Sequence, residues 1–139
     1  MKISARVDNS FGKHVVTLTT NDAARELPIP CMADGAGSSA NGGELLCLAL
    51  ATCYCNDLYR EARKRGIEVE RVEVDVNATF GAEGAPAEQI AYRARVSAKA
   101  SREAIIELIR HTDTVTEIQN TLRRSCPVAL TGIEAHAAV

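Results

Sequence analysis

The sequence lacks a long hydrophobic run and a surplus of charge of one sign. Its longest nearly unbroken apolar stretch extends only from Leu45 to Cys55, well short of the ~20 residues that a membrane-spanning helix needs. The N-terminus, MKISARVDNSFGK, has no apolar segment of the kind found in secretion signals. Lys and Arg number 16 against 18 Asp and Glu, mixed along the chain, which favours neither nucleic acid nor membrane as a partner. These absences predict a cytoplasmic protein.

A disulfide framework is also lacking. The cysteines number five, an odd count, and their spacing is irregular, whereas small secreted domains carry paired cysteines. In a reducing compartment they are thiols, ligands or redox groups. With 139 residues, of which 46% are hydrophobic, the chain is long enough for one domain with a real core and too short for two ordinary ones. We therefore expect a single domain over residues 1–139.

The N-terminal part of the sequence reads as a hairpin followed by a loop. Residues 2–8 and 13–20 are rich in β-forming residues and are separated by the turn-like tetrad at 9–12. Residues 27–29 lie among prolines and are expected to form only an edge strand or an extended loop. The small, flexible residues 33–43 predict a loop, and loops of this length are often functional.

A long helix is predicted next. Asn41 and Glu44 have the spacing of a capping box, and Gly66 is a stop signal. Residues 45–51 are apolar on nearly every face, whereas the sequence after Asp57 is charged. The pattern therefore predicts a helix that begins in the core and ends in water.

The remaining pattern completes an α+β fold. Residues 72–78 and 90–97 alternate between apolar and polar, as in half-buried strands, and their acidic and basic polar faces suit cross-strand pairing. Ser101 caps one predicted helix and Thr114 opens another, while residues 128–133 are expected to form a last strand. The order β-β-(β)-α-β-β-α-α-β predicts helices packed on one face of an antiparallel sheet.

The cysteines divide by context. Buried packing is the default for a free cysteine, and we expect it of Cys31 and Cys47. Cys53 and Cys55 point about 200° apart on a helix and cannot share one metal ion. Cys53 lies at the polarity boundary of the long helix, and Cys126 lies on a connection just before a proline. This pair is therefore a candidate redox couple, with inert packing as the alternative.

Three stretches, GELLCLALATCYCNDL, ARKRGIEVERVEVDV and SCPV, resemble the osmotically inducible protein C and organic hydroperoxide resistance (OsmC/Ohr) family, and the similarity extends from about Lys2 to His136. The resemblance implies an OsmC-like intertwined homodimer that reduces organic hydroperoxides as a thiol peroxidase. Cys53 would be the peroxidatic thiolate and Cys126 the resolving thiol. A small dithiol, of the lipoyl kind in some relatives, would be the reductant, and neither a cofactor nor a metal ion is expected.

The sequence departs from the peroxidase members where they hold a cation against the thiolate. Those members open the helix with a Pro-Glu pair whose Glu positions an N-terminal Arg, but this chain has two glycines there, at 42–43. Glu44 is the nearest acid, and the resemblance leaves Arg6, Lys13 and Arg25 as candidates for the cation beside the thiolate and substrate. Two alternatives stay open: a non-catalytic OsmC-like dimer that binds a small molecule or senses redox state, and a structural dimer with buried thiols.

Overall fold

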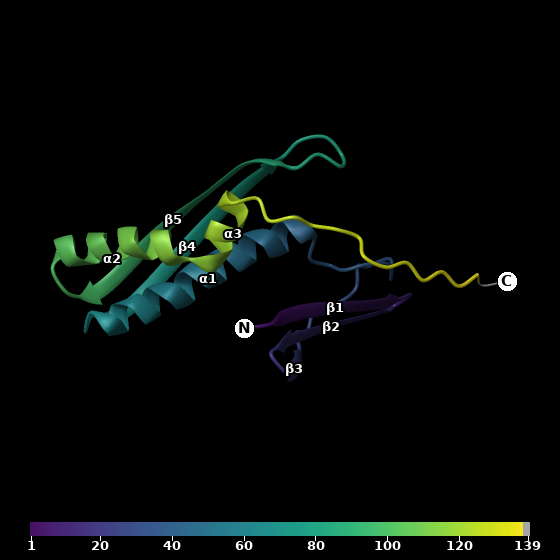
Figure 1. Cartoon of the computed structure of the whole chain (residues 1–139), viewed down its shortest axis with the longest axis horizontal. Coiled ribbons are helices and arrows are strands. Elements are labelled where there is room, and N and C mark those ends of the chain that lie inside the picture. The colour runs from purple at the N-terminus through teal and green to yellow at the C-terminus, as the bar shows by residue number, and fades with distance from the viewer. Residues whose placement is uncertain (138–139) are drawn as a thin grey trace. The chain divides into compact units, whose positions relative to one another are not determined.

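The computed structural model describes residues 1–137, which group into two compact units, Met1–Leu48 and a second unit from Ala49 onward. The elements, labelled in Figure 1, are β1 (Ile3–Ser10), β2 (Lys13–Thr20), β3 (Ala23–Glu26), α1 (Gly42–Lys64), β4 (Glu68–Phe80), β5 (Ala87–Lys99), α2 (Arg102–Val115) and α3 (Glu117–Arg123). The predicted α+β class is confirmed. The predicted single antiparallel sheet is wrong for residues 1–137, where β1, β2 and β3 form one sheet and β4 and β5 another. A single domain over residues 1–139 stays a prediction.

The first unit is built on the predicted hairpin, which is confirmed. β1 and β2 pair antiparallel, with Val7 opposite Val16, and Gly12 turns the chain at φ 78°. The third strand is residues 23–26, which were not predicted as a strand, and residues 27–29 form a loop, the second of the two alternatives expected for them. The chain reverses at Asn21, where φ is 52°, so β3 starts at once, and the prolines that follow have no N–H to donate to a ladder.

The start of α1 follows the predicted capping box. The Glu44 amide donates to Asn41 Oδ1 at 2.8 Å, and the Asn41 amide donates to Glu44 Oε1 at 3.0 Å. The helix ends as predicted near Gly66, which adopts φ 65°, and the Ile67 amide returns to the Ala62 carbonyl at 2.9 Å. This pattern of a left-handed glycine and a backward hydrogen bond is a common helix terminus.

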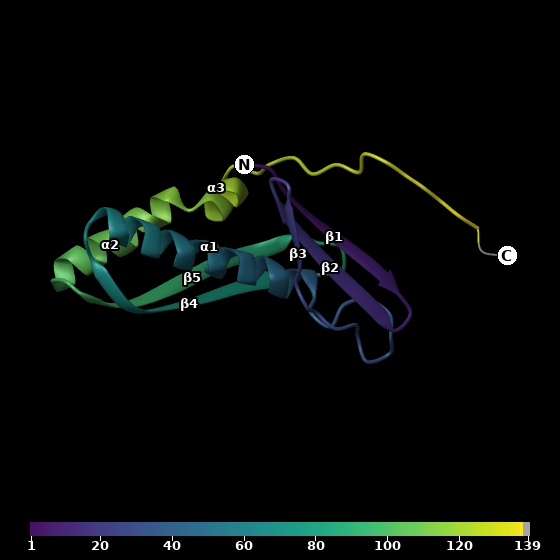
Figure 2. The same ribbon diagram turned by 90° about the horizontal axis from the view of Figure 1, so that it is seen from below.

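The second unit packs helices on one face of a long hairpin. β4 and β5 pair antiparallel with Glu73 opposite Arg95 and Asp75 opposite Arg93, which confirms the predicted pairing of charges across the strands. Both views show α2 and the second half of α1 along the same face of this hairpin (Figures 1 and 2). The core between these layers contains Tyr54, Leu58, Ala62 and Leu108, with partly buried strand residues against it.

The position of this core corrects the expectation for the start of α1, whereas the last residues of the helix, 63–64, are exposed as predicted. Leu48, in the apolar first half of the helix, is 56% exposed, whereas Leu58 and Ala62 are buried. The second half is the part that α2 and the β4–β5 hairpin cover. Within the apolar run Leu50 is buried but Leu48 is not, so the burial of α1 depends on which neighbours contact each of its faces.

The C-terminal part differs from the prediction in two places. Ser101 caps α2 as expected, accepting from the Ala104 amide at 3.2 Å, but Thr114 lies inside the last turn of α2 and α3 starts after Thr116. The expected strand at 128–133 is absent from the described residues, of which 124–137 belong to no helix or strand. A strand needs a neighbour to pair with, and the described chain supplies none there. Of the helices in residues 1–137, none has the length and apolar character that a membrane crossing requires.

Candidate functional site

Cys53 lies on the face of α1 that meets α3, between two carboxylates. Its Sγ is 3.4 Å from Asp57 Oδ2 and 3.8 Å from Glu117 Oε2. Asp57 follows Cys53 by one helical turn, so the two side chains share a face of α1. Glu117 is the first residue of α3 and is brought here by the fold. The thiol is half-buried and Asp57 is 6% exposed.

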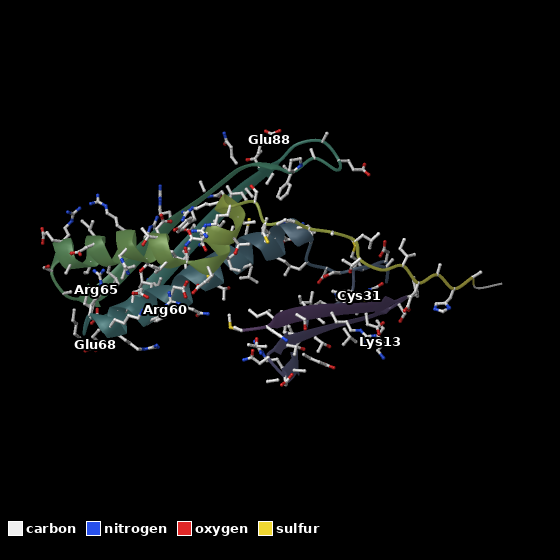
Figure 3. The ribbon with its side chains drawn as sticks, viewed as in Figure 1. Lys13, Cys31, Arg60, Arg65, Glu68 and Glu88 are labelled. Carbon is white, nitrogen blue, oxygen red and sulfur yellow. The ribbon has the colours of Figure 1, made fainter. Side chains whose placement is uncertain are left out.

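Arg60 donates hydrogen bonds to both of these carboxylates and to a third, that of Glu61. Its Nη1 donates to Asp57 Oδ1 at 2.7 Å and to Glu117 Oε1 at 3.4 Å, and its Nε donates to Glu61 Oε1 at 2.9 Å. Figure 3 labels Arg60 on α1. The guanidinium is a planar fork of donors that suits several carboxylate oxygens at once. Its charge partly balances the acids that flank the thiol.

Glu61 connects α1 to α2 through its carboxylate. Besides Arg60, it accepts from Lys64 Nζ at 2.9 Å and lies 3.2 Å from His111 Nε2 of α2. Hydrogen bonds from Lys64 and then Arg60 lower the pKa of Glu61 to about 2. A buried carboxylate is tolerated when its oxygens are paired in this way, so this cluster keeps α1 and α2 in register beside the thiol.

The electrostatic surroundings favour the neutral form of the Cys53 thiol. Burial raises the pKa of Cys53 most, the Ile118 backbone amide lowers it, and the nearby Asp57 and Glu117 raise it further. Burial and then Glu117 also raise the pKa of Asp57. An ordinary thiol with a pKa of ~8.5 is only about 3% ionised at pH 7, and Cys53 is less ionised than that. The Cys53 sulfhydryl is thus a hydrogen-bond donor to Asp57.

Cys126, the other predicted redox residue, lies outside regular structure. α3 ends at Arg123, Ser125 adopts a left-handed φ of 52°, and Cys126 follows it, exposed and unpaired. Cys53 is likewise a free thiol. The Cys53–Cys126 pairing therefore stays a prediction.

Glu44 and the three candidate cations belong to the first unit. Glu44 is part of the α1 cap. Arg6 forms an exposed ion pair with Asp8 at 3.5 Å. Cross-strand neighbours share a face of a sheet, and the register places Arg6 and Lys13 on one face and Arg25, opposite Leu18, on the other. The three side chains therefore do not lie on one face of the sheet, so at most two of them can reach a site on a given face. Their roles toward Cys53 stay predictions.

Asp57, Arg60 and Glu117 were not identified from the sequence. Asp57 and Arg60 follow Cys53 by four and seven residues, a spacing that places them along one helix face and that the sequence could have revealed. Glu117 is 64 residues from Cys53, and no local pattern links the two. Within residues 1–137, no hydrogen bond joins the Cys53 sulfur to an Arg or Lys.

The other cysteines occupy different surroundings. Cys55 lines a pocket of about 260 Å³ together with Val72 and Val74 of β4, so it points away from the carboxylates at Cys53. Cys31 pairs with Ser38 in an isolated β-bridge. Cys47 is half-buried on α1. Cys53 is thus the cysteine that combines partial burial with contacts to two carboxylates.

The cluster also has ligand atoms of the kinds that bind metals. One atom each from Cys53, Asp57 and Glu117 lies within 4.8 Å of the others, and zinc accepts such thiolate and carboxylate ligands. Arg60, however, donates to both carboxylates, and a bound cation would face its positive charge. The arrangement fits proton exchange between thiol and carboxylate better than metal binding.

Comparisons with known proteins bear on the fold and the family. The model of the family described as OsmC-like protein matches residues 35–131. An OsmC-like protein from Mycoplasma pneumoniae is 18% identical, with a TM-score of 0.60, over 89% of this chain and 87% of that one. An organic hydroperoxide resistance protein from Legionella pneumophila is 18% identical, with a TM-score of 0.58, over 88% and 90% of the two chains. The organic hydroperoxide resistance protein OhrB of Bacillus subtilis is 20% identical, with a TM-score of 0.51, over 89% and 90%. Among curated proteins, none matches the chain.

Proposed function

The chain belongs to the OsmC-like protein family, and we propose that it is a thiol-dependent hydroperoxide reductase with Cys53 as the peroxidatic and Cys126 as the resolving residue. The observation that carries the proposal is the placement of α3. This helix begins at Glu117, in contact with the Cys53 sulfur, and Cys126 lies three residues beyond its end. The seven residues of α3 rise about 10 Å, and residues 124–126 can span a similar length when extended. This tether is long enough for Cys126 to return to Cys53.

The chemistry uses only thiols and the peroxide. The Cys53 sulfur attacks one peroxide oxygen, the O–O bond breaks, and the products are a Cys53 sulfenic acid and an alcohol. The Cys126 thiol then attacks the sulfenic sulfur, which releases water and forms the disulfide. A dithiol reductant of the lipoyl type then reduces this disulfide, which restores both thiols and leaves the reductant oxidised to its own disulfide. Turnover of cumene hydroperoxide in the presence of a dithiol tests the proposal directly.

We also propose a homodimer. β4 and β5 form a two-stranded sheet, and within residues 1–137 no further strand pairs with either outer edge. Unpaired edges of this kind present backbone N–H and C=O groups that can pair with a strand of another chain. Ile3 and Val7, on the apolar face of β1, are also largely exposed. A second copy of the chain would bring its own strand edges to pair with those of β4 and β5 and its own apolar side chains to cover those of β1.

Sedimentation velocity at micromolar concentration is expected to give a species of about 30 kDa, twice the chain mass of 14.9 kDa. The reason is that burial of exposed apolar side chains such as Leu48 stabilises association at roughly 25 cal/mol per Å². A compact species of one chain mass at the same concentration would rule out the dimer.

Glu44→Gln is expected to lower the free energy of unfolding by about 0.5 to 1 kcal/mol, as changes at helix caps do. The capping acceptor is retained but its negative charge is lost from the first turn of α1. Urea denaturation measures the stability, and hydroperoxide consumption should fall less than in Cys53→Ser. If Glu44→Gln instead loses as much activity as Cys53→Ser while folding normally, Glu44 has the catalytic role of the family Glu.

A second candidate is a redox-sensing or small-molecule-binding dimer without turnover. It is favoured by the two carboxylates at Cys53, which keep the thiol protonated and therefore slow to react. Such a protein would be oxidised once by peroxide but would not consume further peroxide with a dithiol present. Turnover under those conditions separates the two candidates.

A further inference from the structure

The two carboxylate oxygens of Asp57 contact different groups, the Cys53 thiol and the Arg60 guanidinium. One carboxylate oxygen, Oδ2, accepts from the Cys53 sulfhydryl at 3.4 Å, and the other, Oδ1, accepts from Arg60 at 2.7 Å. The guanidinium orients the carboxylate, because its bond to Oδ1 leaves Oδ2 facing the sulfur. A hydrogen-bonded donor and acceptor in this arrangement are poised to exchange a proton.

We propose that Asp57 is a further catalytic residue, which accepts the proton of the Cys53 thiol and delivers it to the oxygen that leaves the hydroperoxide. This inference rests on the proposed hydroperoxide reductase function. It assigns to a carboxylate the role of general base and then general acid at the reacting sulfur. Arg60 is a positioning residue, because it acts on the sulfur only through Asp57.

The step balances with the peroxide as oxidant. As the sulfur attacks the distal oxygen, the S–H proton passes to Asp57 and a new S–O bond forms. The O–O bond breaks, and its electron pair goes to the oxygen that carries the organic group. Asp57 returns its proton to that alkoxide, which leaves as the alcohol. The sulfur loses two electrons, the peroxide gains two, and Asp57 ends as it began.

Asp57 suits this role better than Glu117. The Asp57 side chain is 9% exposed and closer to the sulfur, whereas Glu117 is 63% exposed and 3.8 Å away. Burial and the neighbouring Glu117 raise the pKa of Asp57, which makes it a better proton acceptor than an ordinary aspartate. A general base must also lie within hydrogen-bond reach of the proton that it takes, and Asp57 meets this condition at the Cys53 sulfur.

Asp57→Asn separates proton transfer from the other effects of the carboxylate. The change removes a negative charge beside the sulfur, so alkylation of Cys53 by iodoacetamide at pH 7 should rise about threefold or more. Alkylation needs no proton for its leaving iodide. The single-turnover rate with cumene hydroperoxide should instead fall at least about tenfold, since general acid–base catalysis contributes about 100-fold or more and the added thiolate offsets part of the loss.

Glu107→Gln serves as the control. It likewise converts a carboxylate to its amide, but on the exposed side of α2, and it should leave both rates unaltered. A cumene hydroperoxide rate in Asp57→Asn equal to or above that of the unaltered protein would overturn the role of Asp57 and leave the proposed function intact. If the unaltered protein consumes no hydroperoxide, both proposals fail.

The pH profile of the unaltered protein gives a test that needs no variant. The charged or titratable groups that contact Asp57 are Cys53 and Arg60 from α1 and Glu117 from α3. Since the reactive form holds one proton between Cys53 and Asp57, hydroperoxide reduction should rise with pH and fall again once the thiol pKa is passed. Iodoacetamide alkylation should only rise to a plateau. If hydroperoxide reduction and alkylation both rise with pH to a plateau, the proposal that Asp57 carries a proton during the reaction is contradicted.

Discussion

Cys53→Ser is expected to abolish the consumption of organic hydroperoxide by the protein, so that only the uncatalysed loss of hydroperoxide in buffer remains. The serine hydroxyl is far less nucleophilic than a thiol and is not oxidised by peroxide. It still donates to Asp57, so the packing of α1 against α3 should persist and the free energy of unfolding should change little. The measurement is the loss of cumene hydroperoxide over time at equal protein concentrations, with and without a dithiol.

Cys55→Ser is the matched control for this change. It removes a thiol two residues along the same helix, but from the side that faces Val72 and Val74. We expect its hydroperoxide consumption to stay near that of the unaltered protein. If Cys53→Ser still turns over peroxide and Cys55→Ser does not, the peroxidatic residue has been assigned to the wrong face of α1.

Cys126→Ser is expected to stop the cycle after its first half. Cys53 can still be oxidised, but no thiol within the chain is assigned to resolve the sulfenic acid, so this species should accumulate. One equivalent of hydroperoxide should be consumed rapidly and dimedone should then label Cys53. Dithiol-dependent turnover should fall steeply, because the reductant no longer meets a disulfide.

Cys31→Ser is the corresponding control, since Cys31 lies in an isolated bridge of the first unit and has no proposed role. It should turn over normally and give no dimedone adduct. Undiminished turnover in Cys126→Ser would mean that the dithiol reduces the sulfenic acid directly. Cys126 would then lose its assigned function.

The sequence predicted those parts of the fold that depend on local pattern. The alternation around Val74 and Tyr92 defined β4 and β5, because period-two patterning fits only a strand with one covered face. The three-residue spacing of Asn41 and Glu44 predicted the start of α1, and the structure contains both of the hydrogen bonds that a capping box implies. These features need no information about distant parts of the chain.

Features that depend on distant neighbours were predicted less well. The strand at 128–133 has the right composition, but Val128 and Leu130 are exposed because the described chain offers no ladder partner. The burial of Leu58 instead of Leu48 reflects the positions of α2 and the β4–β5 hairpin. The approach of Glu117 to Cys53 depends on how α2 and α3 are stacked, which no spacing in the sequence encodes.

The most direct test of the account is the disulfide itself. The reduced protein is treated with one equivalent of cumene hydroperoxide, its free thiols are alkylated, and its peptides are mapped without reduction. We expect Cys53 joined to Cys126, with Cys31 and Cys47 alkylated. Recovery of Cys53 and Cys126 as free thiols after the peroxide has been consumed, or no consumption of peroxide at all, would contradict the two-cysteine mechanism.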